Sequence, residues 1–242
     1  MPVMNAELKD ILFLDIETVA ISEDYGQLDD RLKAQWSRKA GFFKREENQT
    51  DEDLFNARAG IYAEFGKIVS IAVGMFTETG GAFGLRTKYF TSHNEAQLLT
   101  GFKQLLEKLG PSTRLCAHNG KEFDFPYMSR RMLVNGIRLP EVLNLGGKKP
   151  WEVQHLDTLE LWKFGDYKHY TSLDLLAALF NIPTSKGVMD GSQVNEVYYK
   201  EKDLKKISVY CVGDVVAVAQ LYLCLKGHPL IPEENITHAG DE

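Results

Sequence analysis

Residues 11–18 read Ile-Leu-Phe-Leu-Asp-Ile-Glu-Thr, an apolar run that passes directly into acidic residues. A short apolar run of this kind is typical of a buried central strand, here ending where the polar residues begin. Side chains two positions apart on a strand lie on one face, so Asp15 and Glu17 are expected to project together. Ligand sites tend to form at such strand ends in α/β sheets. The plainer alternative is a strand that merely meets a polar turn.

The rest of the sequence supplies the other elements of an α/β fold. β-Branched residues at 67–77, the turn signal Gly80-Gly81 and residues 82–91 predict a hairpin, and short apolar stretches predict strands at 114–117 and 155–159. Helices are predicted after the capping box Ser92-x-x-Glu95 and from Asp124, Thr171 and Asp203. This order predicts a central mixed sheet of five or six strands flanked by helices.

We expect residues 1–242 to form a single domain. Residues 22–66 are rich in charge and favour helix near 27–40 and 51–65, so they are interpreted as an insertion that flanks the core. The tail after Pro232 is expected to be frayed.

Composition narrows the class of function. The chain has 242 residues, of which 44% are hydrophobic and 26% charged, which fits an ordinary soluble globular protein. A net charge of −6 argues against a protein that coats nucleic acid through a broad basic face, although cations bound to carboxylates can supply positive charge locally. We expect no membrane-spanning run and no signal peptide, and we interpret the three cysteines as buried free thiols. These features predict a cytoplasmic protein.

Two further motifs carry acidic residues. His118-Asn119-Gly120-Lys121-Glu122-Phe123-Asp124-Phe125-Pro126 links a predicted strand to a helix, and Asp124 is either a helix N-cap or a ligand. Tyr210-x-x-x-Asp214 places two polar side chains one turn apart on a helix face that continues with apolar residues and so points inward. A buried Tyr–Asp pair bonded to backbone groups is the alternative.

Together the three motifs bring four carboxylates toward one point, those of Asp15, Glu17, Asp124 and Asp214. Like charges packed together resist ionisation unless cations lie among them. Oxygen ligands without a thiolate select Mg²⁺ or Mn²⁺. Two such ions, roughly 3.5–4 Å apart, can stabilise the attacking and leaving oxygens of a phosphoryl transfer.

The sequence resembles the DEDD superfamily of 3′–5′ exonucleases, whose fold is ribonuclease H-like. Residues 13–18 resemble its first motif, 118–124 its second and 210–214 its third. Tyr210, four residues before the last aspartate, makes the third motif similar to that of the tyrosine (DEDDy) subclass. The other subclass has a histidine five residues before this aspartate, where the present sequence has Val209. The stretches 148–153 and 155–162 further resemble stand-alone bacterial exonucleases related to the proofreading domain of family-B DNA polymerases.

The resemblance implies a role for each motif residue. Asp15 would bridge two divalent cations, Glu17 and Asp214 would complete the site of the ion that activates water, and Asp124 would hold the second ion. Tyr210 would orient the attacking water. Contacts to the terminal nucleotide would come from the backbone of Thr18 and Val19, from stacking on Phe123, and from His118 and Asn119.

The function that follows is metal-dependent removal of nucleoside 5′-monophosphates from the 3′ end of DNA that is single-stranded or frayed. An exoribonuclease or oligoribonuclease would use the same carboxylates, and a ribonuclease H-type endonuclease also gathers acidic residues on this sheet. A non-catalytic nucleic-acid-binding or polymerase-associated module is the alternative outside the enzymes. The sequence contains no polymerase domain, so a proofreader would find its polymerase or a repair partner in trans. It does not indicate an oligomeric state.

Overall fold

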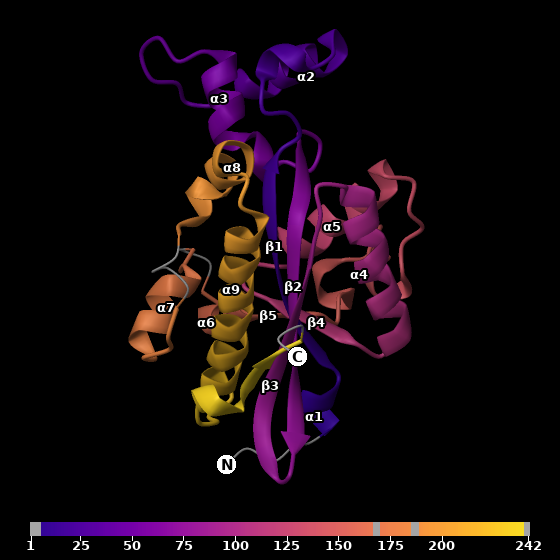
Figure 1. Cartoon of the computed structure of the whole chain (residues 1–242), viewed down its shortest axis with the longest axis vertical. Coiled ribbons are helices and arrows are strands. Elements are labelled where there is room, and N and C mark those ends of the chain that lie inside the picture. Colours follow the sequence, from indigo (N-terminus) through magenta and orange to yellow (C-terminus); the bar gives the residue numbers. More distant parts are fainter. Residues whose placement is uncertain (1–5, 167–169, 185–188, 240–242) are drawn as a thin grey trace.

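The computed structural model describes residues 6–166, 170–184 and 189–239. It has the predicted α/β, ribonuclease H-like architecture, a mixed six-stranded sheet flanked by helices (Figure 1). The strands lie in the order β5-β4-β1-β2-β3-β6, with β1 antiparallel to β2 and parallel to β4. Their bounds are β1 Ile11–Ala20, β2 Gly66–Thr79, β3 Ala82–Thr91, β4 Arg114–Ala117, β5 Leu156–Asp157 and β6 Ile236–His238.

Helices cover both faces of the sheet. In Figure 1, α4 (Glu95–Leu109) and α5 (Asp124–Val134) lie on one side, and α9 (Leu204–Leu225) lies on the other with α6 (Thr158–Lys163) and α7 (Leu173–Leu179) beside it. The other helices are α1 Ala6–Lys9, α2 Asp30–Ala40, α3 Asp51–Arg58 and α8 Val194–Glu196, which continues into a π-helical turn, η7 Val197–Glu201. Short 3₁₀ turns are η1 Tyr25–Gln27, η2 Ala59–Ile61, η3 Glu141–Leu143, η4 Pro150–Glu152, η6 Gly191–Gln193 and η8 Glu233–Asn235.

Strand β1 organises the core because its side chains alternate between the two layers. Leu12, Leu14 and Ile16 pack in the cluster under α4 and α5, whereas Ile11 and Phe13 pack in the cluster under α9. The strand is longer than predicted. It runs through the acidic residues to Ala20 because β2 pairs with it along this whole length. The motif carboxylates therefore lie within the strand and not at its end.

Helix α9 was predicted closely, from the Asp203 cap, whose side chain accepts from Lys206 N, to its last turn. By length and composition it is apolar enough to cross a membrane, which corrects the expectation that the sequence holds no such run. However, 72% of its most apolar window is buried within the protein, against strands β1, β2 and β3. The long apolar run is thus accounted for by the core.

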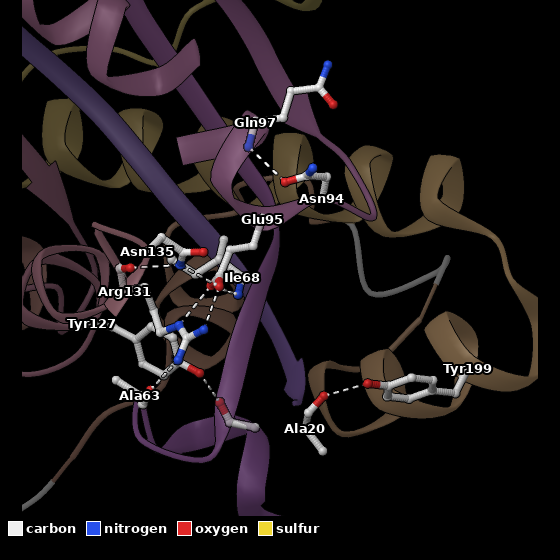
Figure 2. A network of polar contacts seen from close by, with 11 residues as sticks. Ala20, Ala63, Ile68, Asn94, Glu95, Gln97, Tyr127, Arg131, Asn135 and Tyr199 are labelled. Carbon is white, nitrogen blue, oxygen red and sulfur yellow. Dashed lines mark hydrogen bonds and ion pairs between the residues drawn. The ribbon is translucent and has the colours of Figure 1, made fainter. Parts of the chain in front are cut away.

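The start of α4 differs from the predicted capping box. Asn94 is the N-cap, and its side chain accepts from Gln97 N at 3.1 Å. Glu95 instead turns into the protein, where it accepts hydrogen bonds from Ile68 N at 2.8 Å and from Arg131 on α5 (Figure 2). A buried arginine close enough for two parallel hydrogen bonds binds Glu95 more strongly than an exposed helix end would. The pair connects α4 and α5 to the start of β2.

Three other segments differ from prediction or refine it. The strand predicted at 155–159 is only two residues long, because α6 begins directly after it. The Asp157 side chain caps this helix and accepts a hydrogen bond from Leu159 N at 2.9 Å. Between Pro232 and Ala239 the tail is not frayed, since β6 pairs in parallel with β3 and covers the edge of the sheet. The segment 22–66 folds as α2 and α3 around a small core of its own, which contains Trp36, Leu54 and Phe55.

Candidate functional site

Asp15 and Glu17 continue the face of β1 that packs against α9. Across the interface, Cys211 of α9 brings its thiol to 3.4 Å from Asp15 Oδ2 and 3.3 Å from the Asp15 carbonyl oxygen. Ligand atoms of Asp15, Glu17 and Cys211 all lie within 4.8 Å of one another. The side chain of Glu17 is buried and that of Asp15 half-buried. Two adjacent carboxyl groups are thus enclosed between the sheet and one helix.

Asp124 comes to this place from the start of α5. It was predicted as either cap or ligand, and the structure makes it the first helical residue, preceded by Phe123, which makes no side-chain cap bond. Its carboxyl group is buried and forms hydrogen bonds with its own backbone N–H and with the backbone of Ile16 on β1. The side chain therefore points to the strand that carries the other two carboxylates.

Tyr210 and Asp214 lie one turn apart on α9 and share a side-chain hydrogen bond. Tyr210 is buried and Asp214 half-buried. Burial, then Asp214 and Glu17, raise the pKa of Tyr210 far above its usual range. The phenol consequently keeps its proton at any physiological pH and remains a hydrogen-bond donor.

Electrostatics show that the four carboxylates converge. Burial is the main cause that raises the pKa of Asp15 well above its usual value, and Glu17, Asp214 and Asp124 each raise it further. Burial, Asp214 and Asp124 do the same for the pKa of Glu17, while a hydrogen bond between the Glu17 and Asp15 side chains opposes the rise. Burial raises the pKa of Asp124 to about 7. Burial is thus the main cause of all three shifts, and like charges add to each, with Asp157 as the neighbouring charge that raises the pKa of Asp124.

The chemistry of these groups suits divalent cations. No ion pair found among the described residues involves Asp15, Glu17 or Asp124, so none of the lysines and arginines that the structure describes neutralises them. Buried carboxylates without a counter-charge need either protons or a bound cation. Oxygen donors from three elements offer the hard ligands that Mg²⁺ and Mn²⁺ prefer. Cys211 is protonated, since burial and the nearby carboxylates raise its pKa, and so it is a hydrogen-bond donor in this cluster.

The residues predicted to contact a nucleotide differ in how deeply they are buried. Thr18 and Asn119 are half-buried, and Asn119 has a positive φ of 63°, which a turn asparagine tolerates. Val19 is completely buried and its backbone pairs with Lys67 on β2. Phe123 is half-buried, with its ring 5.3 Å from that of Tyr127.

His118 is committed to contacts within the protein. Its Nε2 donates to the Thr171 carbonyl at 2.8 Å, which leaves Nδ1 of the neutral ring to accept from the Thr158 hydroxyl at 2.9 Å. Burial lowers the pKa of His118, which favours that neutral form. The structure thus shows the imidazole joining β4 to the start of α6 and the approach to α7.

Asp157 fixes the loop that carries Asn119. Its two carboxylate oxygens accept from Asn119 N at 3.0 Å and from Lys121 N at 3.1 Å, while it also caps α6. Asp157 is thus both a helix cap and a buried hydrogen-bond acceptor. Cys211 was interpreted only as a buried thiol. Its position, one residue after Tyr210 and three before Asp214 on an inward face, was the available signal for its place beside Asp15.

A cavity of about 950 Å³ lies elsewhere. It runs between α9 and the β3–β6 edge, beside residues 181–184, and its lining includes none of the four carboxylates. Volume alone therefore does not locate the acidic site.

Comparison with known proteins gives one family. Residues 61–229 match the model of a family described as predicted 3′–5′ exonucleases related to the exonuclease domain of PolB. The match includes Asp124, Tyr210 and Asp214, whereas Asp15 and Glu17 precede it. No curated protein matches the chain.

Proposed function

We propose that this chain, which belongs to the family of predicted 3′–5′ exonucleases related to the exonuclease domain of PolB, removes nucleoside 5′-monophosphates from the 3′ end of DNA with two divalent cations. The family supports exonuclease activity on nucleic acid in general. DNA as the substrate, a single-stranded or frayed end and the tyrosine subclass are our proposals. The observation that carries the two-ion reaction and the tyrosine subclass is the convergence of Asp15, Glu17 and Asp124 beside the Tyr210–Asp214 pair.

The proposed site residues divide the work. Asp15, Glu17, Asp124 and Asp214 would hold two Mg²⁺ or Mn²⁺ ions, which when bound stabilise charge on the attacking and leaving oxygens of the phosphodiester. Tyr210 retains its phenolic proton and can position a water molecule for in-line attack by a hydrogen bond. Phosphodiester hydrolysis then adds this water to phosphorus and releases the 3′ oxygen of the preceding nucleotide.

Other parts of the proposal rest on the whole chain. β1 shares one sheet with the elements in the family match, which supports a single exonuclease domain with α2 and α3 as an appended arm. The free thiols at Cys116, Cys211 and Cys224 favour a reducing compartment, and we place the protein in the cytoplasm. Action alone or with a polymerase or repair partner in trans is compatible with this arrangement.

Degradation of end-labelled oligonucleotides tests the proposed reaction. Matched single-stranded DNA and RNA are incubated with Mg²⁺ or Mn²⁺, and parallel samples receive EDTA. We expect a ladder that shortens from the 3′ end of DNA, is lost with EDTA, and is slower on RNA. Faster cleavage of RNA would move the assignment to an exoribonuclease, and tight binding without cleavage would move it to a non-catalytic module.

A further inference from the structure

One segment of this acidic chain is strongly basic. Residues 31–45, which comprise most of α2 and the turn after it, contain six lysines and arginines and no aspartate or glutamate, although the whole chain has a net charge of −6. Acidic residues bound the segment on both sides, at Asp30 and Glu46. Within this segment, positive charge is therefore not offset by acidic residues. Its cations are Arg31, Lys33, Arg38, Lys39, Lys44 and Arg45.

Half of these cations are already engaged. Lys33 Nζ donates to the Gly26 carbonyl at 2.6 Å, Lys39 Nζ lies 3.9 Å from the centre of the Tyr62 ring, and Arg45 pairs with Asp51. The remaining three, Arg31, Arg38 and Lys44, are exposed and form no ion pair within the described ranges.

Two of the free cations share one face of α2. Arg31 and Arg38 are seven residues apart on α2, which places them two turns apart on one side, at an axial separation of about 10 Å. Trp36, on the opposite side of the helix, is completely buried against α3 and the end of β1. The two guanidinium groups therefore face solvent in line, with Lys44 just beyond the helix.

An aromatic ring accompanies these charges. Phe42 follows the end of α2 and is 90% exposed, although its neighbour Phe43 packs against Trp36 at 6.0 Å between ring centres. Phe42 is therefore not part of this small core. Cations that alternate with an exposed aromatic ring are the composition by which proteins bind single-stranded nucleic acid, because phosphates meet the cations and a base stacks on the ring.

The segment is fixed to the strand that carries the acidic site. Trp36 Nε1 donates to the Asp51 carbonyl at 2.8 Å, which ties α2 to α3, and their common core includes Ala20, the last residue of β1. Ala20 lies three residues beyond Glu17, or about 10 Å along a strand. In Figure 1, α2 and α3 lie beyond the end of β1 and the start of β2, which are adjacent because the two strands are antiparallel.

We propose that Arg31, Arg38, Phe42 and Lys44 form a second contact for the substrate, which binds the single strand several nucleotides upstream of the 3′ end. This inference rests on the proposed exonuclease function. It specifies that the substrate is a single strand longer than binding at the active site alone would require. Phosphate contacts from the three cations hold the strand without reading its sequence, and Phe42 stacks on one base.

The test compares two triple variants of equal net charge. One is Arg31→Gln/Arg38→Gln/Lys44→Gln, and its control is Lys9→Gln/Lys108→Gln/Arg138→Gln, which removes exposed cations from α1, α4 and the segment after α5. Anisotropy of a 5′-labelled 20-nucleotide DNA strand is measured in EDTA from 25 to 200 mM KCl. Hydrolysis of the p-nitrophenyl ester of thymidine 5′-monophosphate, which has no upstream strand, is measured with Mn²⁺.

We expect the first variant to lose about tenfold or more in affinity at 50 mM KCl, and the magnitude of its salt slope to fall by about 2, since each phosphate contact on a single strand contributes about 0.7. The control should keep the wild-type slope, and both variants should hydrolyse the ester normally. Phe42→Ala should lose about fivefold or more in affinity with an unchanged slope.

Equal salt slopes for the two triple variants would overturn the second contact, and the face would then serve another partner or none. Failure of the wild type to hydrolyse either the ester or the strand would instead overturn the proposed exonuclease function. Because binding is measured in EDTA, the two results are independent.

Discussion

The Cys211 thiol lies 3.4 Å from Asp15 Oδ2, so a helix that supplies Tyr210 and Asp214 also supplies a hydrogen bond to the carboxylate on the central strand. The raised pKa of Cys211 keeps the donor proton in place. This contact restricts the orientation of Asp15, one of the residues that would hold the two ions.

Replacement of Cys211 tests that restriction. Cys211→Ser keeps a donor and should leave the metal requirement close to that of the wild type. Cys211→Ala should raise the Mn²⁺ concentration for half-maximal rate about fivefold, corresponding to about 1 kcal/mol for one hydrogen bond, with the rate largely recovered at saturating Mn²⁺. Cys224→Ala, on the same helix but in the cluster beside α7, is the control. An alanine variant with the wild-type metal requirement would show that the contact has no positioning role.

The proposed metal ligands predict a graded loss of activity. Asp15→Ala and Asp214→Ala should reduce strand cleavage by at least about a thousandfold while circular dichroism shows a retained fold. Tyr210→Phe should lose less, about ten- to a hundredfold, because the carboxylates remain and only the positioning of water is impaired. Turnover at the wild-type rate by either aspartate variant would refute the assignment of the site.

Stability without metal should depend on pH. The folded-state pKa of Asp124 is raised to about 7 from its ordinary value of 3.8, so the folded protein binds more protons at this group than the unfolded chain between these pH values. The contribution of Asp124 to stability therefore falls as pH rises from about 4 to about 7. Urea denaturation in EDTA should show a loss of more than about 1 kcal/mol over this range, reduced in Asp124→Asn.

Divalent cations should reverse that loss. Binding to the folded state alone raises stability with the logarithm of the free ion concentration. We expect Mn²⁺ at pH 7.5 to raise the melting temperature of the wild type by several degrees and that of Asp15→Ala by much less. An equal rise in both proteins would place the bound ion elsewhere.

The Glu95–Arg131 pair should be a major determinant of stability. Both side chains are buried, and Glu95 also accepts from Ile68 N at 2.8 Å and Asn135 Nδ2 at 2.9 Å. Arg131→Ala should destabilise the fold by about 3–5 kcal/mol, because it leaves a buried carboxylate without its cation. Glu107→Ala, on the same helix as Glu95, breaks only the exposed pair with Lys103. It should lower the free energy of unfolding by less than about 1 kcal/mol in urea denaturation.

Local chemistry made much of this protein predictable from its sequence. The apolar run that begins β1 and the capping of α9 by Asp203 depend on neighbours in the chain, and both were found where predicted. Likewise, spacing of two on a strand places Asp15 and Glu17 on one face, and spacing of four on a helix pairs Tyr210 with Asp214.

Other features depended on partners distant in the sequence. Glu95 was predicted to cap α4 but binds Arg131, and the tail became a strand because β3 offered an unpaired edge. Cys211 came to lie beside Asp15 across 196 positions of sequence. Most of the elements, their faces and the acidic residues that they present could be predicted from the sequence, since these follow from local geometry. Only the tertiary structure decided which buried polar groups meet, because burial makes each of them require a partner that packing alone can supply.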